Sequence, residues 1–162
     1  MELNALAARA VALLKDKELT VATAESCTGG MIATAITDVA GASRVFGTGV
    51  VSYSCDCKMK LLGVSVATLA AEGAVCAATA AQMAEGVRRV GDASIGVSVT
   101  GEAGPVAAED HPVGTVFIGL ADGEGTVTEE HHFEGDRTAI RRQAACAVLS
   151  LLIRRLEGGA VC

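Results

Sequence analysis

The sequence predicts an α/β fold, a three-layer α/β/α sandwich built on a mixed, mostly parallel sheet. Helical and strand patterns alternate along a chain of 162 residues, a length typical of one domain. Hydrophobic residues make up 51% of the chain but aromatic residues only 2%, so small aliphatic side chains must fill the core. Such side chains favour helices packed closely on a sheet. A short turn at 122–125 joins the last two strand patterns and makes part of the sheet antiparallel.

The first three elements are predicted to be a helix, a strand and a helix. Leucine and alanine recur at helical spacing over residues 3–17, with basic residues off the apolar stripe, which predicts an amphipathic helix. A short apolar run predicts a strand at 20–24. An alanine-rich run after two glycines predicts a helix at 31–39, and a turn containing Gly and Ser follows at 40–43.

A second strand and three helices are predicted in the middle of the chain. Residues 46–53 are rich in Val, Ser and Thr, which is typical of a strand. Two short helices are expected at 55–62 and 66–72. The segment 77–90 places its apolar residues on one face and its charged residues on the other, which predicts a longer helix.

The last third of the chain is predicted to form a strand, a long loop, a hairpin and a helix. Alternating apolar and small residues predict the strand at 95–100, and the loop at 101–112 has a length that often carries function. The hairpin strands are expected at 113–121 and 126–133. Asp136 is placed to cap the final helix, whose apolar residues again share one face.

Composition excludes several classes of protein. Thirteen basic and nineteen acidic residues give a net charge of −6 without any long basic block, so we expect no nucleic acid partner. No uncharged run approaches the ~18 residues of a membrane span, and the N-terminus lacks the pattern of a signal peptide. We therefore expect a cytoplasmic domain spanning 1–162, with a flexible tail at 158–162 and no membrane contact.

Metal and cofactor sites are not expected. The six cysteines are spread along the chain and are typical of small buried hydrophobes. Cys55 and Cys57 form the one close pair, and with no second pair or nearby histidine they give only a weak metal signal. The apolar face of the helix at 77–90 favours a homodimer.

The segment around Ser26 is the first candidate for chemistry. It lies where the strand at 20–24 turns directly into the next helix, and the free backbone N–H groups of such a turn face an anion or a developing oxyanion. The glycines after Thr28 allow a ligand to approach the backbone closely. The alternative is a simple helix N-cap, in which Ser26 or Thr28 accepts a hydrogen bond from a free N–H group.

Polar residues follow three predicted strands. Ser26 follows the first, Tyr53 and Lys58 follow the second, and Thr100 and Gly101 end the third. Ligands of open α/β sheets bind outside the carboxyl ends of the strands, so these groups are expected to converge. A lysine can act as a base when burial lowers its pKa, whereas the three histidines lie in the loop and hairpin. The alternatives are a solvated Lys58 and a Tyr53 that belongs to the core.

Several motifs resemble the CinA C-terminal domain family in order and spacing. They include TAESCTGG at 23–30, VSYS at 51–54, LLGV at 61–64, VTGEAGP at 99–105 and PVGTV at 112–116. The resemblance covers almost the whole chain and implies the same three-layer fold. The family includes bacterial nicotinamide-nucleotide amidases, so it also implies hydrolysis of nicotinamide mononucleotide to nicotinic acid mononucleotide and ammonia, in pyridine-nucleotide recycling.

The resemblance also implies roles for individual residues. Ser26 would be the nucleophile, Lys58 its base, and Tyr53 the group that orients or relays the proton. We expect backbone N–H groups at the Gly29–Gly30 helix start to hold the oxyanion. We assign the contacts with the small-molecule nucleotide substrate to Glu25, Thr28, Gly29, Gly30, Thr100, Gly101 and Arg137.

The chain departs from the family pattern at five places, of which all but Cys76 lie beside this predicted site. Cys55 stands where the family usually has Asn, Cys57 where Ala is usual, and Glu102 where an apolar residue is expected. Residues 106–108 replace a turn like Asp-Gly-Gly, and Cys76 replaces a serine that would cap the helix at 77–90.

Three other functions remain open from the sequence. The domain would be a nucleotide-binding or regulatory module if these departures abolish catalysis. Cys27 would be the nucleophile of a thiol amidase, because a helix N-terminus lowers the pKa of a thiol. An oligomeric scaffold is the third alternative.

Overall fold

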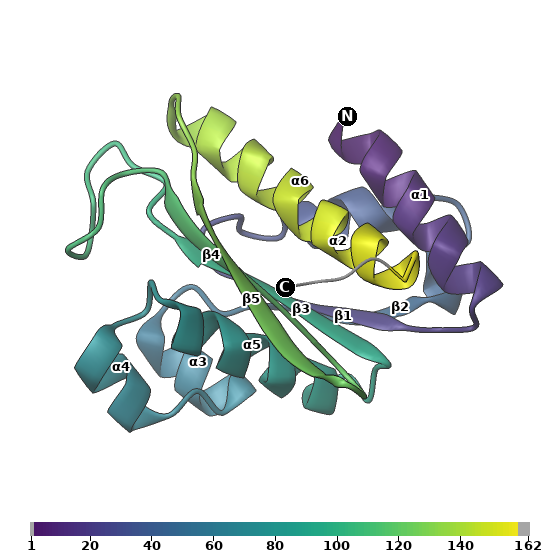
Figure 1. Cartoon of the computed structure of the whole chain (residues 1–162), viewed down its shortest axis with the longest axis horizontal. Helices are drawn as coiled ribbons and strands as arrows, with labels where there is room; N and C mark the ends of the chain where they lie inside the picture. The colour runs from purple at the N-terminus through teal and green to yellow at the C-terminus, as the bar shows by residue number, and fades with distance from the viewer. Residues whose placement is uncertain (1, 159–162) are drawn as a thin grey trace.

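A computed structural model describes residues 2–158, in which five strands form one mixed sheet (Figure 1). The sheet order is β2-β1-β3-β4-β5. β1 pairs in parallel with both β2 and β3, whereas β4 is antiparallel to β3 and to β5. The strands are β1 (Val21–Glu25), β2 (Phe46–Val51), β3 (Ile95–Gly101), β4 (Thr115–Asp122) and β5 (Gly125–His132).

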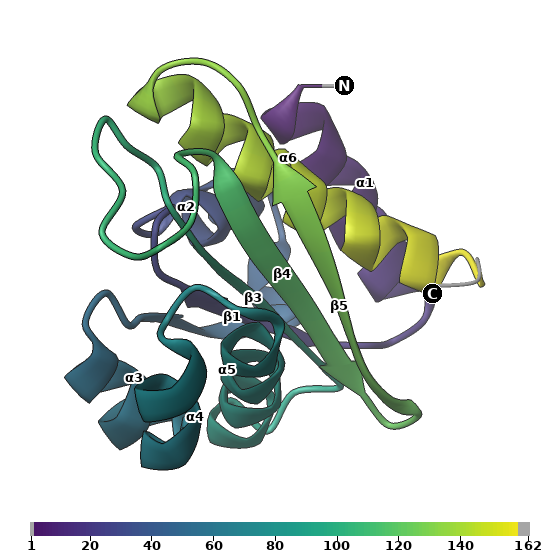
Figure 2. The ribbon, with the colours of Figure 1, turned by 60° about the vertical axis from the view of Figure 1, so that its left-hand side comes forward.

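The helices cover both faces of this sheet (Figure 2). One face carries α1 (Leu3–Asp16), α2 (Met31–Thr37) and α6 (Arg137–Leu156). The other carries α5 (Ala77–Val90), against which α3 (Cys55–Leu62) and α4 (Val66–Glu72) pack. A short 3-10 helix, Ala42–Arg44, leads into β2. The predicted α/β fold with three layers and a mixed sheet is thereby confirmed.

Small residues let α5 lie close to the sheet. A Cβ atom added at Gly96 of β3 would lie 2.1 Å from the carbonyl oxygen of Ala84, and one at Gly119 of β4 would lie 2.7 Å from that of Ala80. Ser98 of β3 donates a hydrogen bond of 2.6 Å to the same Ala80 oxygen. The core is correspondingly aliphatic, since Val, Leu, Ile and Ala supply most of its buried side chains.

The observed elements follow the predicted ones, with differences at their ends. β2 ends at Val51 because Ser54 already caps α3, where its side chain accepts a hydrogen bond of 3.1 Å from the N–H of Cys57. Asp136 caps α6 as expected, accepting from the N–H of Ala139 at 2.8 Å. Of the predicted tail, residues 159–162 lie outside the described part of the chain. Between residues 2 and 158 no helix is long and apolar enough to span a bilayer.

Candidate active site

The carboxyl ends of β1, β2 and β3 meet at one edge of the sheet, and a cavity of about 270 Å3 lies there. Ser26 and Cys27 reach it from the end of β1, Tyr53 from the end of β2, and Thr100 from the end of β3. Lys58 of α3 and Arg137 of α6 also line it. Segments 74–75 and 102–109 supply most of the remaining wall.

Ser26 and Lys58 form a buried pair in this cavity. The Lys58 Nζ lies 2.8 Å from the Ser26 Oγ and donates a hydrogen bond of 2.7 Å to the Ser52 carbonyl oxygen. Lys58 is only 1% exposed and Ser26 only 8%. Burial lowers the pKa of Lys58 from its ordinary value of 10.5, against a weaker opposing effect of nearby cysteines and Glu109. A neutral amine beside a serine hydroxyl is suited to take its proton.

The local fold of α3 explains why Lys58, and not Lys60, faces the serine. The helix begins at the cap Ser54 and ends at Gly63, whose φ of +70° suits a left-handed C-cap. Lys58 lies on the face turned toward the sheet, whereas Lys60 is exposed and pairs with Asp56 at 2.8 Å. Two lysines in one short helix therefore have opposite environments.

Tyr53 lies at the rim of the cavity and does not contact the pair. Its side chain is 60% exposed, and its hydroxyl accepts a hydrogen bond of 2.9 Å from Arg137 Nη2. Arg137 Nη1 donates to the carbonyl oxygen of Gly104 at 2.5 Å. Within residues 2–158, no hydrogen bond joins Tyr53 to Ser26 or Lys58. The expected proton relay through the tyrosine is therefore absent from this conformation.

Glu25, predicted as a substrate contact, does not line the cavity of Ser26. Its carboxylate accepts a hydrogen bond of 2.5 Å from the Thr28 hydroxyl. It also accepts from the N–H groups of Gly30 and Ile32, both at 3.1 Å, and of Ala33 at 2.9 Å. These are donors that the start of a helix leaves free, and a carboxylate is favoured there by the helix dipole. Glu25 and the Thr28 hydroxyl thus stabilise the start of α2.

Gly29 and Gly30 do not line the cavity of Ser26 either. The N–H of Gly29 donates to the Ser26 carbonyl oxygen at 3.1 Å, and that of Gly30 is bound by Glu25. With Thr28 and Arg141 they line a separate hollow. The predicted oxyanion donors are therefore already in use. The N–H of Cys27 directly follows the serine and, within residues 2–158, donates to no other residue, so it is a candidate donor.

Thr100 and Gly101 line the cavity as expected. The Thr100 hydroxyl is occupied, because it donates a hydrogen bond of 2.8 Å to the carbonyl oxygen of Ala74. This hydrogen bond holds the 74–75 segment of the cavity wall in place. Gly101 lies against β4, where an added Cβ atom would be 2.7 Å from a side-chain carbon of Val116.

Two carboxylates in the cavity wall were not predicted as site residues. Glu102 is buried and accepts hydrogen bonds from the N–H groups of Ala108 and Glu109, both at 2.8 Å. Glu109 in turn accepts from the N–H groups of Ala74 at 2.7 Å and Val75 at 3.1 Å. The sequence marked Glu102 as a departure from the family. It carried no signal for Glu109, whose partners lie more than thirty residues away.

The cysteines near the site have different environments. Burial raises the pKa of the Cys27 thiol to about 12. Cys55 is exposed where it lines the cavity. Cys76 still caps α5, because its sulfur accepts a hydrogen bond of 3.3 Å from the N–H of Thr79. Among the described residues, no three His, Cys, Asp or Glu side chains are grouped closely enough to hold a metal ion.

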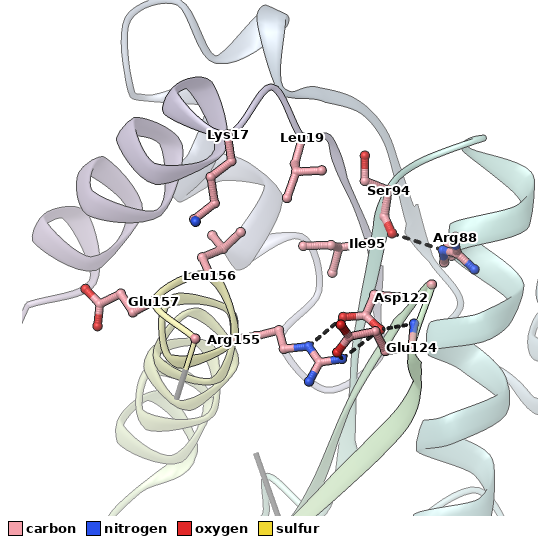
Figure 3. Close-up of a pocket in the computed structure, with 12 residues that line it drawn as sticks. Lys17, Leu19, Arg88, Ser94, Ile95, Asp122, Glu124, Arg155, Leu156 and Glu157 are labelled. Atoms are coloured by element: carbon pink, nitrogen blue, oxygen red, sulfur yellow. Dashed lines mark hydrogen bonds and ion pairs between the residues drawn. The ribbon is translucent and has the colours of Figure 1, made fainter. Parts of the chain in front are cut away.

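A larger cavity of about 710 Å3 lies at the opposite end of the sheet (Figure 3). There Arg155 of α6 forms a bidentate pair with Asp122, at 2.6 and 2.9 Å, and also contacts Glu124 at 2.8 Å. Arg88 donates to the Ser94 carbonyl oxygen at 3.0 Å. Arg155, Asp122 and Glu124 thus bind one another and join α6 to the β4–β5 hairpin, which gives them a structural role.

The chain resembles known proteins over nearly its whole length. The family model of the CinA C-terminal domain matches residues 3–156 of the sequence. A CinA-like protein of Frankia casuarinae is 50% identical over 146 residues, which cover 90% of this chain and 34% of that protein. A CinA-like protein of Geobacter sulfurreducens is 49% identical over 145 residues, covering 89% and 35%. The chain thus spans about a third of the length of these curated relatives.

Solved structures show the same fold. A CinA superfamily protein from Klebsiella pneumoniae aligns with a TM-score of 0.95 at 32% identity, covering 98% of this chain and 99% of that one. The competence/damage inducible protein CihA from Agrobacterium tumefaciens aligns with a TM-score of 0.92 at 39% identity, covering 97% and 96%. With its sequence match and its fold in agreement, this chain belongs to the CinA C-terminal domain family.

Proposed function

We propose that this domain is a serine–lysine amidohydrolase that converts nicotinamide mononucleotide to nicotinic acid mononucleotide and ammonia. The observation that carries the proposal is the buried contact of 2.8 Å between the Lys58 Nζ and the Ser26 Oγ. Burial lowers the pKa of this lysine, which suits a general base. The choice of substrate is supported by membership of a family that includes nicotinamide-nucleotide amidases.

The proposed reaction proceeds through an acyl-enzyme. Neutral Lys58 takes the Ser26 proton as the Ser26 Oγ bonds to the carboxamide carbon. The resulting oxyanion is stabilised by the N–H of Cys27, which directly follows the nucleophile. When the C–N bond breaks, Lys58 returns its proton to the departing nitrogen and ammonia leaves. Lys58 then deprotonates a water molecule that attacks the ester, which releases the acid and restores the serine.

Arg137 and Tyr53 are proposed to contact the nucleotide at the rim. A guanidinium matches the geometry of a phosphate or a ribose hydroxyl pair. The hydrogen bond of 2.9 Å to the Tyr53 hydroxyl orients Arg137 over the cavity opening. Tyr53 is therefore proposed as a positioning residue and not as a proton relay.

The alternative nucleophile, Cys27, is disfavoured by its environment. Cys27 is 5% exposed, and its pKa of about 12 leaves almost no thiolate at neutral pH. No lysine or histidine is hydrogen-bonded to its sulfur within residues 2–158. We expect Cys27→Ala to retain ammonia release while Ser26→Ala abolishes it.

The test is to measure ammonia and the acid product from nicotinamide mononucleotide. Ser26→Ala and Lys58→Ala are each expected to lower the rate by about a thousandfold or more, because nucleophile and base act as a unit. Lys60→Ala is the matched control on the same helix and is expected to keep the wild-type rate. Wild-type turnover by Ser26→Ala would refute the mechanism. Tight nucleotide binding without any product would instead support a binding or regulatory module.

A further inference from the structure

The cavity beside Ser26 contains two carboxylates, although the proposed substrate is itself an anion. Glu102 is 3% exposed and holds the base of the 102–109 segment through the N–H groups of Ala108 and Glu109. Glu109 lies nearer the surface and reaches across the cavity wall to the N–H groups of Ala74 and Val75. The proposed reaction uses neither group, so the position of Glu109 needs its own explanation.

The backbone at residues 73–75 is shaped to hold an anion. Two successive N–H groups point to one carboxylate, at 2.7 Å from Ala74 and 3.1 Å from Val75. Gly73 has a φ of +80°, and a Cβ atom added there would lie 2.5 Å from the Glu109 Oε2. Only glycine leaves space for an anionic oxygen at this point. The hydrogen bond from Thr100 to the Ala74 carbonyl oxygen ties the segment to the end of β3.

Glu109 lines a cavity that lies at the small end of the range for ligand pockets. Pockets for small molecules usually measure about 300–1,000 Å3. The cavity of Ser26 measures about 270 Å3 with Glu109 in its wall. Because the carboxylate belongs to a surface loop, it can leave the cavity without moving the core. Its departure would free two N–H donors in the same cavity as the serine.

We infer that the Gly73–Val75 backbone is an anion subsite of this cavity, which Glu109 occupies until the phosphate of a ligand displaces it. The assignment of that phosphate to the substrate rests on the proposed function. A phosphate offers more acceptor oxygens than a carboxylate and carries more charge, so it competes well for the same N–H pair. A ligand without a phosphate does not compete for this N–H pair, so its binding does not depend on Glu109.

Calorimetric titrations of the Ser26→Ala protein test this inference without turnover. The ligands are inorganic phosphate, nicotinamide mononucleotide and the corresponding nucleoside without phosphate. If Glu109 fills the subsite about nine-tenths of the time, Glu109→Ala tightens binding of both phosphate ligands by about tenfold, because apparent affinity scales with the open fraction. Glu109→Gln is expected to act in the same direction. The nucleoside should bind all variants equally.

Asp110→Ala is the matched control, since it removes the same charge from the neighbouring, exposed position of the loop. It should leave all three affinities unchanged. Equal or weaker binding of the phosphate ligands by both Glu109 variants, an equal gain for the nucleoside, or no phosphate binding by any variant would overturn the subsite. A wild-type protein that releases no ammonia would refute the proposed function alone, because these titrations do not depend on catalysis.

Discussion

The buried amine of Lys58 carries a cost in folding free energy. A protonated lysine is poorly solvated inside a protein, so burial lowers its pKa from 10.5 and the folded state holds the proton more weakly than the unfolded chain. Stability therefore rises with pH between the lowered folded-state pKa and 10.5. The hydrogen bonds to Ser26 and Ser52 offset only part of this cost. Such a position is typical of a residue retained for chemistry.

We predict that Lys58→Met abolishes ammonia release and raises the thermal midpoint. Met has a similar length and no charge to desolvate. The stability of the Lys58→Met protein therefore lacks the pH dependence that Lys58 gives the wild type. Its advantage should be greatest below the lowered pKa of Lys58 and should shrink as pH rises toward 10.5. Thermal melts across this pH range measure it. In the same range, wild-type kcat/KM should rise as Lys58 loses its proton.

Lys60→Met is the control for this prediction, because Lys60 is exposed on the same helix. It should change neither the rate nor the pH dependence of the melting temperature. A difference between wild type and Lys58→Met that is constant with pH would show that burial does not shift the lysine.

At the scale of elements, sequence patterns located the helices and strands better than they located side-chain partners. Lys58 was predictable because a short helix after a strand end has one face toward the sheet. The role of Glu25 was not predictable, because a carboxylate before a helix can either cap the helix or bind a ligand. Only the hydrogen bonds at the start of α2 decide between these two roles. Glu109 depends on a contact between distant loops, which no local pattern encodes.

The junction of α6 with the β4–β5 hairpin depends on the pair between Arg155 and Asp122. The hydrogen bonds from Arg155 lower the pKa of Asp122 below its ordinary value of 3.8. A lowered carboxyl pKa contributes stability above the unfolded pKa, and that contribution is lost as pH falls through the folded-state value. We predict that Arg155→Ala costs about 1 kcal/mol at neutral pH. The difference from wild type should shrink below pH 3.8.

Urea unfolding at several pH values measures this difference. Lys60→Ala provides a comparison, because it breaks an ion pair whose partners are 71% and 63% exposed, and it should leave stability unchanged. An Arg155→Ala defect that persists unchanged in acid would exclude Asp122 as the group responsible.

At the scale of the whole molecule, the position of Lys58 depends on the fit between α3 and α5. Gly86 of α5 faces the end of α3, and a Cβ atom added there would lie 1.9 Å from the carbonyl oxygen of Leu62. Arg89 of α5 donates to that same oxygen at 3.2 Å. The helix that carries the proposed base is therefore positioned by a helix that contributes no residue of the proposed catalytic pair.

We predict that Gly86→Ala lowers both stability and activity. Alanine is better than glycine in a helix by about 1 kcal/mol, but overpacking against backbone costs about 1–3 kcal/mol. Displacing α3 also moves the Lys58 Nζ away from Ser26, so kcat should fall while the helix content stays the same. Gly47→Ala is the control, because nothing lies within 4 Å of its added Cβ atom. A melting temperature and rate equal to wild type in Gly86→Ala would contradict this account.

The hydrogen bonds of Glu25 should slow the exchange of amide hydrogens at the start of α2. The first amide hydrogens of a helix usually exchange quickly with solvent, because they have no partner within the helix. Here a buried carboxylate binds those of Gly30, Ile32 and Ala33. These amides should exchange with deuterium as slowly as those of the central strands, and only when the domain unfolds as a whole. The start of α2 would thus be among the last parts of the molecule to open.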